Sequence, residues 1–329
     1  MKYDSIELII QNNENGNIYE VSNIVSDIKT SKSINNSAGK CNFTLDFSNK
    51  KLEIPLGSIV RFSVIQNNKK YGKFFGYIFE KEFNEKNKLS VTAYDQLRYL
   101  KNNETFILTN KTLKDVINII GNQYQLRLGE VEGNEYILPQ RIEDNKSLGD
   151  IIQRAIDFTL QGTKKKYIIR DEFGYLCCRD VSKLVTDLII GNVSLLNTYN
   201  YKESIDNEVY NCIKLYKDNE KTGKRETYIT LDSNNIKKWG KLQKYESVNE
   251  NMNEYQIKEK ADQLLYLYNR VNKTISLKCQ GVLELEVGNG IFLEIIDIPG
   301  VKFNHNALIT KIEDEFKNGN HNMELEVMI

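Results

Sequence analysis

The same β-rich pattern occurs twice in this chain, and this duplication restricts the fold more than any other feature. The first copy covers residues 56–95 and the second covers residues 287–327. Each copy contains three stretches of alternating apolar residues separated by polar turns, a pattern typical of antiparallel sheet with one solvated face. A unit copied within one polypeptide predicts two related β-domains.

Two landmarks align the copies. Gly57 and Gly288 each open the first strand, and Phe83 and Phe316 each follow acidic residues in the second strand, in FEKEF and IEDEF. The glycine and the phenylalanine are 26 residues apart in the first copy and 28 apart in the second. The segment TISLKC before the second copy also parallels CNFTLDF before the first. We therefore expect the duplication to include one preceding strand.

The remaining segments predict a mainly β chain with an α+β insertion. Residues 1–100 read as strands without a long helix, which favours a small antiparallel barrel or sandwich. Residues 101–200 contain two amphipathic helices, TLKDVINII and SLGDIIQRA, each opened by a Thr or Ser with an Asp three residues later. Residues 201–329 return to strands around an inserted helix at 253–271. We predict three domains over these ranges, a β-domain, an α+β domain and a second β-domain.

Composition argues against several classes of function. The chain has 45 Lys and Arg residues and 45 Asp and Glu residues, so bulk charge predicts no nucleic-acid recognition and no membrane binding. Neither a run of about 18 apolar residues nor an apolar leader segment is present, and we expect no membrane span and no signal peptide. The five cysteines lack C-x-x-C spacing, which predicts reduced thiols.

Histidines and cysteines show no spacing of a catalytic or metal site. The only histidines, His305 and His321, are expected in exposed polar connections. Neither has motif spacing with Cys279 for zinc. The vicinal pair Cys177 and Cys178 falls on a predicted strand, which should bury one thiol and expose the other. We predict no catalytic residue, no cofactor and no metal, and hence no enzyme activity.

Paired acids are the one pattern that suggests a hydrolase. A glycosidase needs two carboxyl groups roughly 5–10 Å apart across a cleft. Here Glu80 and Glu82 share one strand face, as do Glu313 and Glu315. Because both copies carry such a pair, we favour a structural or interface role. An acid-catalysed cell-wall hydrolase is the least favoured hypothesis.

The order of the segments resembles that of baseplate hub proteins of contractile phage tails, as found in defective PBSX-like prophages. The resemblance is carried by VTAYDQLRYL at the end of the first copy, by the two helix starts, and by a G-x-L-x-L-x-x-G block at residues 281–288. It spans nearly the whole chain and includes no active-site signature. Late control protein D-like proteins and R-type bacteriocins of the diffocin type belong to the same group.

That resemblance implies two tail-tube-like antiparallel β-barrel domains in tandem, a middle α+β domain, and a homotrimer. Three chains with two barrels each would form a pseudo-sixfold ring that adapts a threefold central spike to a sixfold tail tube. The implied partners are the tail tube protein, the central spike protein, the tape-measure protein and inner baseplate or wedge proteins. The implied location is the baseplate of a phage or bacteriocin particle made in the bacterial cytoplasm. The alternative is a β-rich adhesin or carbohydrate-binding appendage protein.

Overall fold

The computed structural model describes residues 1–34, 37–48, 52–192, 194–219, 224–249, 252–298 and 301–328. Over these residues the chain is mainly β, with several sheets and an α+β part, which confirms the predicted fold class. It divides into a main unit, Met1–Asn200 with Ile275–Ile329, and a small unit, Tyr201–Thr274. The three domain ranges expected from the sequence stay a prediction.

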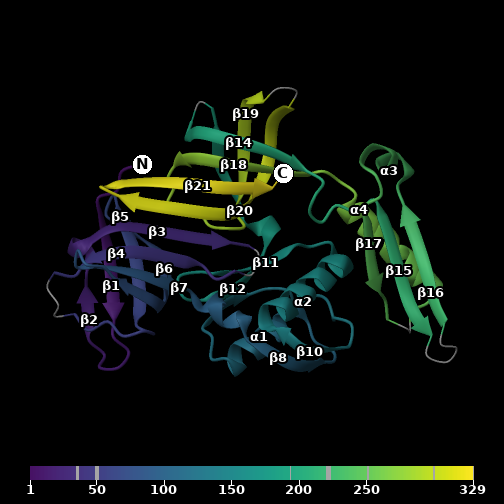
Figure 1. Ribbon diagram of the computed structural model, residues 1–329, viewed down its shortest axis with the longest axis horizontal. Helices are drawn as coiled ribbons and strands as arrows, with labels where there is room; N and C mark the ends of the chain where they lie inside the picture. Colours follow the sequence, from purple (N-terminus) through teal and green to yellow (C-terminus); the bar gives the residue numbers. More distant parts are fainter. Residues whose placement is uncertain are drawn as a thin grey trace. The chain divides into compact units, whose positions relative to one another are not determined.

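The first half of the large sheet in the main unit is antiparallel. Its strands follow the spatial order β3-β4-β7-β6-β5-β1-β2 (Figure 1). A short 3-10 helix, η1 (Ser22–Ile24), precedes β3. The strands are β1 (Ser5–Gln11), β2 (Ile18–Glu20), β3 (Val25–Ser33), β4 (Lys40–Asp46), β5 (Ile59–Gln66), β6 (Lys69–Phe83) and β7 (Lys88–Tyr94).

The second half repeats this order as β14-β18-β21-β20-β19-β13. Strand β20 also pairs antiparallel with β3, so the described residues place thirteen strands in one sheet; in Figure 1 the yellow β20 lies beside the purple β3. The strands are β13 (Val185–Gly191), β14 (Leu196–Ser204), β18 (Asn272–Gln280), β19 (Gly290–Ile298), β20 (Val301–Lys317) and β21 (Asn320–Met328).

The predicted duplication is confirmed in topology and extends further than the sequence indicated. Strands β5, β6 and β7 correspond to β19, β20 and β21, and β4 corresponds to β18, the strand of TISLKC. Strands β1 and β3 have counterparts in β13 and β14. One difference is that β1 is antiparallel to β5 whereas β13 is parallel to β19. We call the two sets the first and second repeats.

Backbone hydrogen bonds fix the alignment of the repeats. The N–H of Gly57 donates to the carbonyl of Ile78 at 2.8 Å, and that of Gly288 donates to Ile309 at 2.8 Å. Both glycines have positive φ, +82° and +86°. One residue after each of these isoleucines, the register shifts at a bulge. The same turn and the same bulge therefore recur 231 residues apart, as the numbering of the two glycines gives.

The alignment of Phe83 with Phe316 is wrong by two residues. Counted from the bulge, Phe83 is level with Asp314, since Phe83 pairs with Leu89 and Asp314 pairs with Met323. The β20–β21 hairpin continues beyond this level to a turn at residues 318–319, and Phe316 lies in that extension. Local similarity of the acidic runs concealed a difference in hairpin length.

The equivalent glycines give a matched pair of variants. Alanine at φ near +80° costs about 1–2 kcal/mol at either position, because Cβ crowds the backbone. At Gly57 an added Cβ has open space, with Asn13 4.0 Å away, whereas at Gly288 it would lie 1.9 Å from Cδ1 of the buried Ile168. We expect Gly288→Ala to lower the free energy of unfolding by about 1–3 kcal/mol more than Gly57→Ala, measured by urea unfolding. Equal losses would contradict this packing.

The α+β part of the main unit confirms the two predicted helices. Thr112 and Asp115 form a reciprocal capping box at α1, and Ser147 caps α2 by accepting from the N–H of Asp150. Strand β8 pairs with β10, and β12 lies between β11 and β9. The elements are η2 (Gln96–Lys101), β8 (Asn103–Leu108), α1 (Leu113–Gln123), β9 (Leu128–Val131), β10 (Arg141–Ser147), α2 (Leu148–Thr163), β11 (Tyr167–Asp171), β12 (Leu176–Asp180) and η3 (Val181–Lys183).

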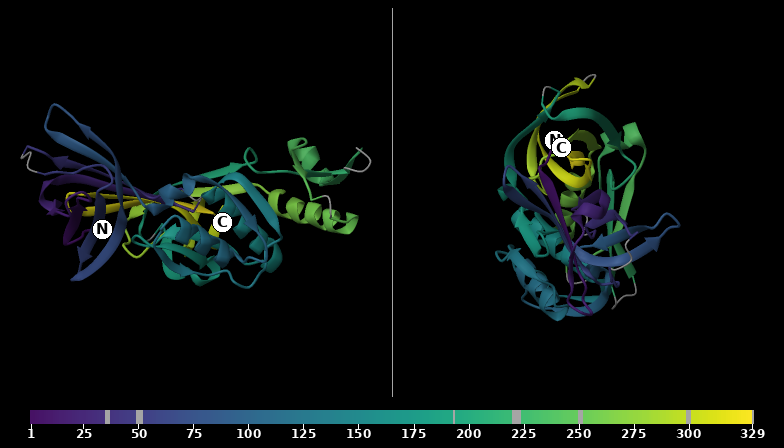
Figure 2. Two further views of the ribbon diagram at one scale, coloured as in Figure 1. Left: turned by 90° about the horizontal axis from the view of Figure 1, so that it is seen from below. Right: turned by 90° about the vertical axis from the view of Figure 1, so that its left-hand side faces the viewer.

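The small unit is a three-stranded sheet with one face covered by α4 (Figure 2). The helix expected at 253–271 runs over Glu254–Tyr268, with Asn253 as its cap. Its apolar face packs Ile257, Ala261 and Leu264 against the sheet residues Ile213 and Leu215. The elements are β15 (Cys212–Asn219), β16 (Lys224–Leu231), α3 (Ser233–Trp239), β17 (Gln243–Ser247) and α4 (Glu254–Tyr268). Among all described residues, no helix has the length and apolar character needed to cross a bilayer.

Candidate functional site at the junction of the two repeats

The junction of the repeats is the pairing of β3 with β20. Thr30 pairs with Asp314, and Ile28 pairs with Phe316. Alternate residues of β3 point inward, so Ile28 and Thr30 are buried and the Lys32 side chain is 11% exposed. The inward face of this strand therefore changes from apolar to polar to charged along its length. Strand β3 therefore makes apolar contacts at Ile28, polar contacts at Thr30 and charged contacts at Lys32.

The apolar end of the junction is an aromatic cluster around Phe316, which is 2% exposed. Its ring lies edge-on to Phe62 of the first repeat, with centroids 5.0 Å apart, and to Tyr3 at 6.0 Å. The His321 ring stacks on its other side at 4.3 Å. Aromatic contacts of this geometry add to the burial of the rings, so Phe316 links the second repeat to the core of the first.

Next to it lies a buried ionic group that we call the junction cluster, Thr30, Lys73, Asp314 and His321. One Asp314 oxygen is 2.7 Å from Nε2 of His321. The other accepts from the Thr30 hydroxyl at 3.2 Å and lies 3.7 Å from Nζ of Lys73. Burial opposes ionisation of Asp314, but Lys73 and the hydrogen bond with His321 outweigh it and lower its pKa. The cluster joins β3, β6, β20 and β21 through the Asp314 carboxylate, whose negative charge is balanced by the ammonium group of Lys73.

The His–Asp pair leaves no room for a substrate. Nδ1 of His321 is buried without a hydrogen-bond partner among the described residues, and a Cβ on Gly281 would lie 2.0 Å from it. A general base must reach the proton it abstracts, directly or through one water. The backbone at residue 281 closes that approach, and the pair contributes a buried hydrogen bond and packing against Phe316.

The expectation of two histidines in exposed connections is wrong for His321, which is 1% exposed on β21. His305 is exposed as expected, but it lies on strand β20 rather than in a connection. The expectation for the vicinal cysteines is also wrong, because Cys177 and Cys178 are both buried. Strand β12 has partners on both edges and is covered on both faces. All five cysteines are free and buried. Burial raises the pKa of Cys177 to about 11, which keeps that thiol protonated.

The paired acids lie on strand faces as predicted. Glu313 pairs with Lys311 at 2.7 Å, and Glu315 pairs with Lys29 at 2.8 Å, both on the solvated face. Glu80 and Glu82 are exposed. Thr30 and Lys73 of the junction cluster were not predicted from the sequence. The sequence did contain a signal for them. Thr30 in IKTSK and Lys73 in GKFFG each lie two residues from an apolar residue of the same strand, and residues two apart in a strand share a face.

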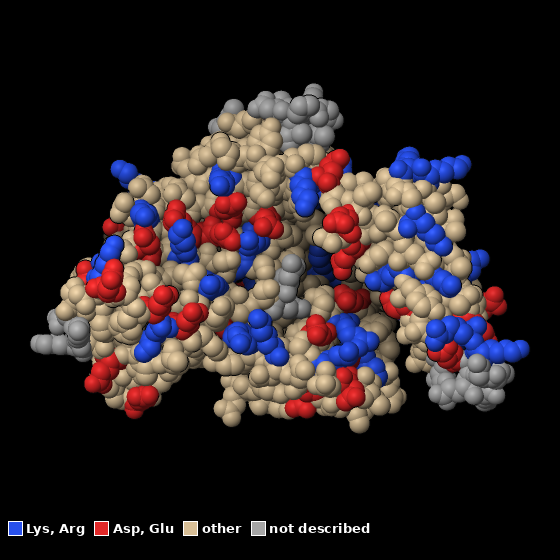
Figure 3. Space-filling model, in the orientation of Figure 1, with Lys and Arg blue, Asp and Glu red and all other residues tan. Residues whose placement is uncertain are grey.

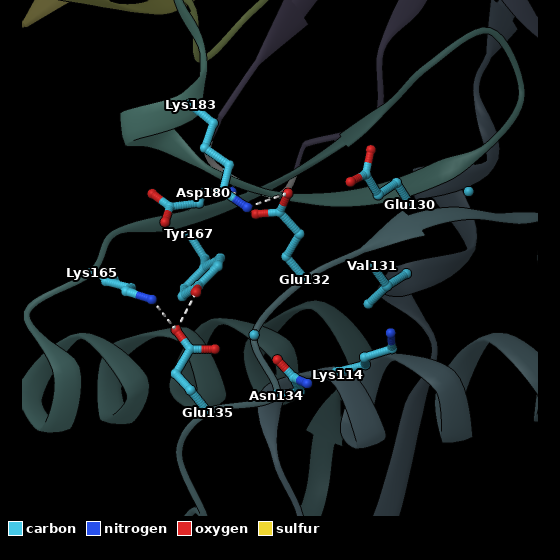
Figure 4. Close-up of a pocket in the computed structure, with 12 residues that line it drawn as sticks. Lys114, Glu130, Val131, Glu132, Asn134, Glu135, Lys165, Tyr167, Asp180 and Lys183 are labelled. Carbon is cyan, nitrogen blue, oxygen red and sulfur yellow. Dashed lines mark hydrogen bonds and ion pairs between the residues drawn. The ribbon is translucent and has the colours of Figure 1, made fainter.

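A polar pocket of about 470 Å³ lies in the α+β part (Figure 4). Glu135 accepts from the Tyr167 hydroxyl and lies 3.2 Å from Nζ of Lys165, while Glu132 pairs with Lys183 at 3.2 Å. Burial opposes ionisation of Glu135, but these two donors lower its pKa. Both carboxylates are thus paired with cations from the pocket wall.

The described residues contain no group of three or more His, Cys, Asp or Glu side chains suited to hold a metal ion. On the face shown in Figure 3, basic and acidic side chains are interspersed. This mixture agrees with the zero formal charge of the chain. Among the described residues, the junction is the place where buried polar and aromatic side chains of both repeats meet, and we take it as the candidate functional site.

The sequence of this chain is similar to those of two Bacillus subtilis proteins. The chain is 28% identical to YqbQ of Bacillus subtilis (strain 168) and 25% identical to the phage-like element PBSX protein XkdQ of the same strain. Each match covers 78% of this chain and 77% of the relative.

Solved structures share the fold. The 43 kDa tail protein of prophage MuSo2 from Shewanella oneidensis matches with a TM-score of 0.68 at 15% identity, covering 98% of each chain. An E. coli component of the type VI secretion system, described as structurally similar to the T4 bacteriophage tail proteins gp27 and gp5, matches with a TM-score of 0.57 at 11% identity. That match covers 92% of this chain and 73% of the other. The family model described as YQBQ-like matches residues 28–328, which is most of the sequence, and the chain therefore belongs to the YqbQ-like family.

Proposed function

We propose that this protein is the structural hub of the baseplate in a contractile injection particle. In this role it forms a homotrimer whose six repeats make a pseudo-sixfold ring between a threefold spike and a sixfold tail tube. The observation that carries the proposal is the duplicated strand order, with its repeated glycine turn and bulge. Three copies of a chain with two equivalent units present six equivalent surfaces.

The junction supplies what ring closure requires. A heterologous interface closes into a ring only if the rotation between neighbouring units is fixed at the right value. The β3–β20 pairing, the aromatic cluster and the junction cluster set that rotation within one chain. Covalent linkage also raises the effective concentration of the second unit. Half of the contacts between neighbouring units around the ring are thus made before any subunit meets another.

Relatives support the particle context. They include a protein of a phage-like element, and the solved structures with this fold include a prophage tail protein and a type VI secretion component. We propose the tail tube protein, the central spike protein, the tape-measure protein and inner baseplate proteins as partners. We propose a location in the baseplate of a phage or bacteriocin particle, and no enzyme activity.

The proposal is tested by native mass spectrometry of the protein, alone and co-expressed with the proposed central spike protein. We expect a species of three 38.2 kDa chains, and we expect electron microscopy of that species to show six similar β-units around one axis. A strict monomer in the presence of the spike protein, or a ring of six chains, would overturn the proposed trimer.

A further inference from the structure

The β11–β12 hairpin contacts both repeats, the first through its turn and the second through Arg170 at the base of the turn. The Phe173 ring covers Gly72 of β6, where an added Cβ would lie 2.6 Å from it, and it is edge-on to Phe75 at 6.0 Å. Phe173 has φ of +49° and the buried Gly174 has φ of +89°, which makes the turn tight. At the base of the turn, Arg170 donates to the carbonyl of Val287 in the second repeat at 2.9 Å. We call residues 171–175 the hairpin tip.

Four charged side chains from four separate segments meet at the base of this tip. They are Lys32 of β3, Asp95 after β7, Asp171 of β11 and Glu286 before β19, and we call them the latch cluster. Asp95 and Asp171 are 1% and 3% exposed. Nζ of Lys32 lies 2.9 Å from Glu286 and 3.5 Å from the Asp171 carbonyl. Glu286 is thus the carboxylate that pairs directly with Lys32, and the charge of Lys32 also acts on the Asp95 and Asp171 carboxyls.

The other groups that face Asp171 are neutral or paired elsewhere. Its carboxyl accepts from the N–H of Gly174 at 2.7 Å and from the Gln96 amide at 3.2 Å. The neighbouring Arg170 pairs with Glu172 at 2.7 Å, and Lys73, next to Gly72 on β6, belongs to the junction cluster. Lys32 is thus the cation available to Asp171 and Asp95 within the described contacts.

The Asp95 carboxyl is held by backbone donors from both sides. It accepts from the N–H of Gly39 at 2.8 Å and from that of Leu97 at 3.0 Å. Burial and then the charge of Asp171 raise the pKa of Asp95 well above its ordinary value. Burial likewise raises the pKa of Asp171 to about 6, although the hydrogen bond from the N–H of Gly174 and the charge of Lys32 both act to lower it. When Asp95, Asp171 and Glu286 are all ionised, Lys32 balances only one of their charges. Two negative charges then remain uncompensated in the protein interior.

We propose that the latch cluster is a proton-controlled latch, which holds the β11–β12 hairpin against both repeats while a carboxyl is protonated and loosens the hairpin once all three carboxyls are ionised. The latch lies within one main unit and does not depend on trimer formation. Because Asp171 has a raised pKa when the tip is docked, the docked state gains stability that is complete below the ordinary value of 3.8 and is lost as pH rises through about 6.

The test is hydrogen exchange of the amides of residues 172–176 in the full chain between pH 5 and pH 8, corrected for the intrinsic pH dependence of exchange. We expect protection to fall by about tenfold over this range, since pH 5 lies about one unit below the raised pKa of Asp171 and each unit corresponds to tenfold. Asp171→Asn should remove most of this pH dependence. Asp187→Asn, at an exposed site on β13, is the control and should leave it unchanged.

Two further variants separate the latch from simple loss of packing. Glu286→Gln removes a negative charge near Asp171 and should move the pH midpoint of protection downward, whereas Lys32→Met removes the cation and should move it upward. Shifts in opposite directions support the latch even if Asp171→Asn lowers overall stability. Protection that is independent of pH in the wild type, or midpoints that move together, would overturn it.

Discussion

Phe316→Ala should lower the free energy of unfolding by about 3–5 kcal/mol, whereas Phe83→Ala should cost about 1 kcal/mol or less. The two residues have similar positions in sequence, after acidic runs in equivalent strands. Phe316 is 2% exposed and contacts Phe62, Tyr3 and His321, so its removal opens a cavity between the repeats. Phe83 is 59% exposed and contacts Phe47 edge-on at 5.3 Å.

Urea unfolding, followed by far-ultraviolet circular dichroism, measures the free energy of unfolding of both variants in the same way. The main unit should unfold at a lower urea concentration in Phe316→Ala, and Phe83→Ala should resemble the wild type. Similar losses in the two variants would mean that the phenylalanines occupy equivalent environments and that the register-based alignment of the repeats is incorrect. Phe316→Leu keeps most of the volume and should recover a large part of the loss.

Asp314→Asn should cost about 3–5 kcal/mol at pH 7, because it leaves the ammonium of Lys73 buried without a counter-charge. Lys73 is 3% exposed, and its other polar contact, the carbonyl of Leu283 at 3.3 Å, carries no formal charge. The control is Glu313→Gln on the adjacent residue, whose side chain is 48% exposed; this change should cost about 1 kcal/mol or less. Equal costs for the two changes would contradict the junction cluster.

The pH dependence of this effect has a definite sign. The pKa of Asp314 is lowered in the folded protein, so its stabilising effect is present above the ordinary value of 3.8 and is lost as pH falls through the lower folded value. The difference between wild type and Asp314→Asn should therefore persist from pH 7 to pH 5 and shrink at lower pH. The double variant Asp314→Asn with Lys73→Met should be more stable than the two single costs predict, since neither charge is then left alone.

Much of the local structure follows from the sequence alone. The Thr112 and Asp115 spacing predicts the start of α1, and its capping box is present as expected. The alternation in CNFTLDF and TISLKC predicts two strands, which occupy equivalent positions in the repeats. These features depend on contacts within a few residues, so a short window of sequence contains the information that determines them.

The errors in burial share one cause. Alternation assigns residues to two faces of a strand but does not say what covers each face. His321 and Cys178 therefore read as polar or half-exposed positions, although His321 is buried against Phe316 and Cys178 is buried in the apolar core of the α+β part. The misalignment of Phe316 with Phe83 has a separate cause. The β20–β21 hairpin is longer than the β6–β7 hairpin, so Phe316 has no counterpart in the first repeat.

What the sequence by itself determined is that one β-unit is present twice, with its glycine turn, its strands and the helices between the copies. Only the tertiary structure decided that β3 meets β20, and hence that Thr30, Lys73, Asp314 and His321 share one buried site. The physical reason is separation along the chain. Residues 30 and 314 come together only when sheet pairing, burial and charge compensation are satisfied at once, and that balance is a property of the whole packed core.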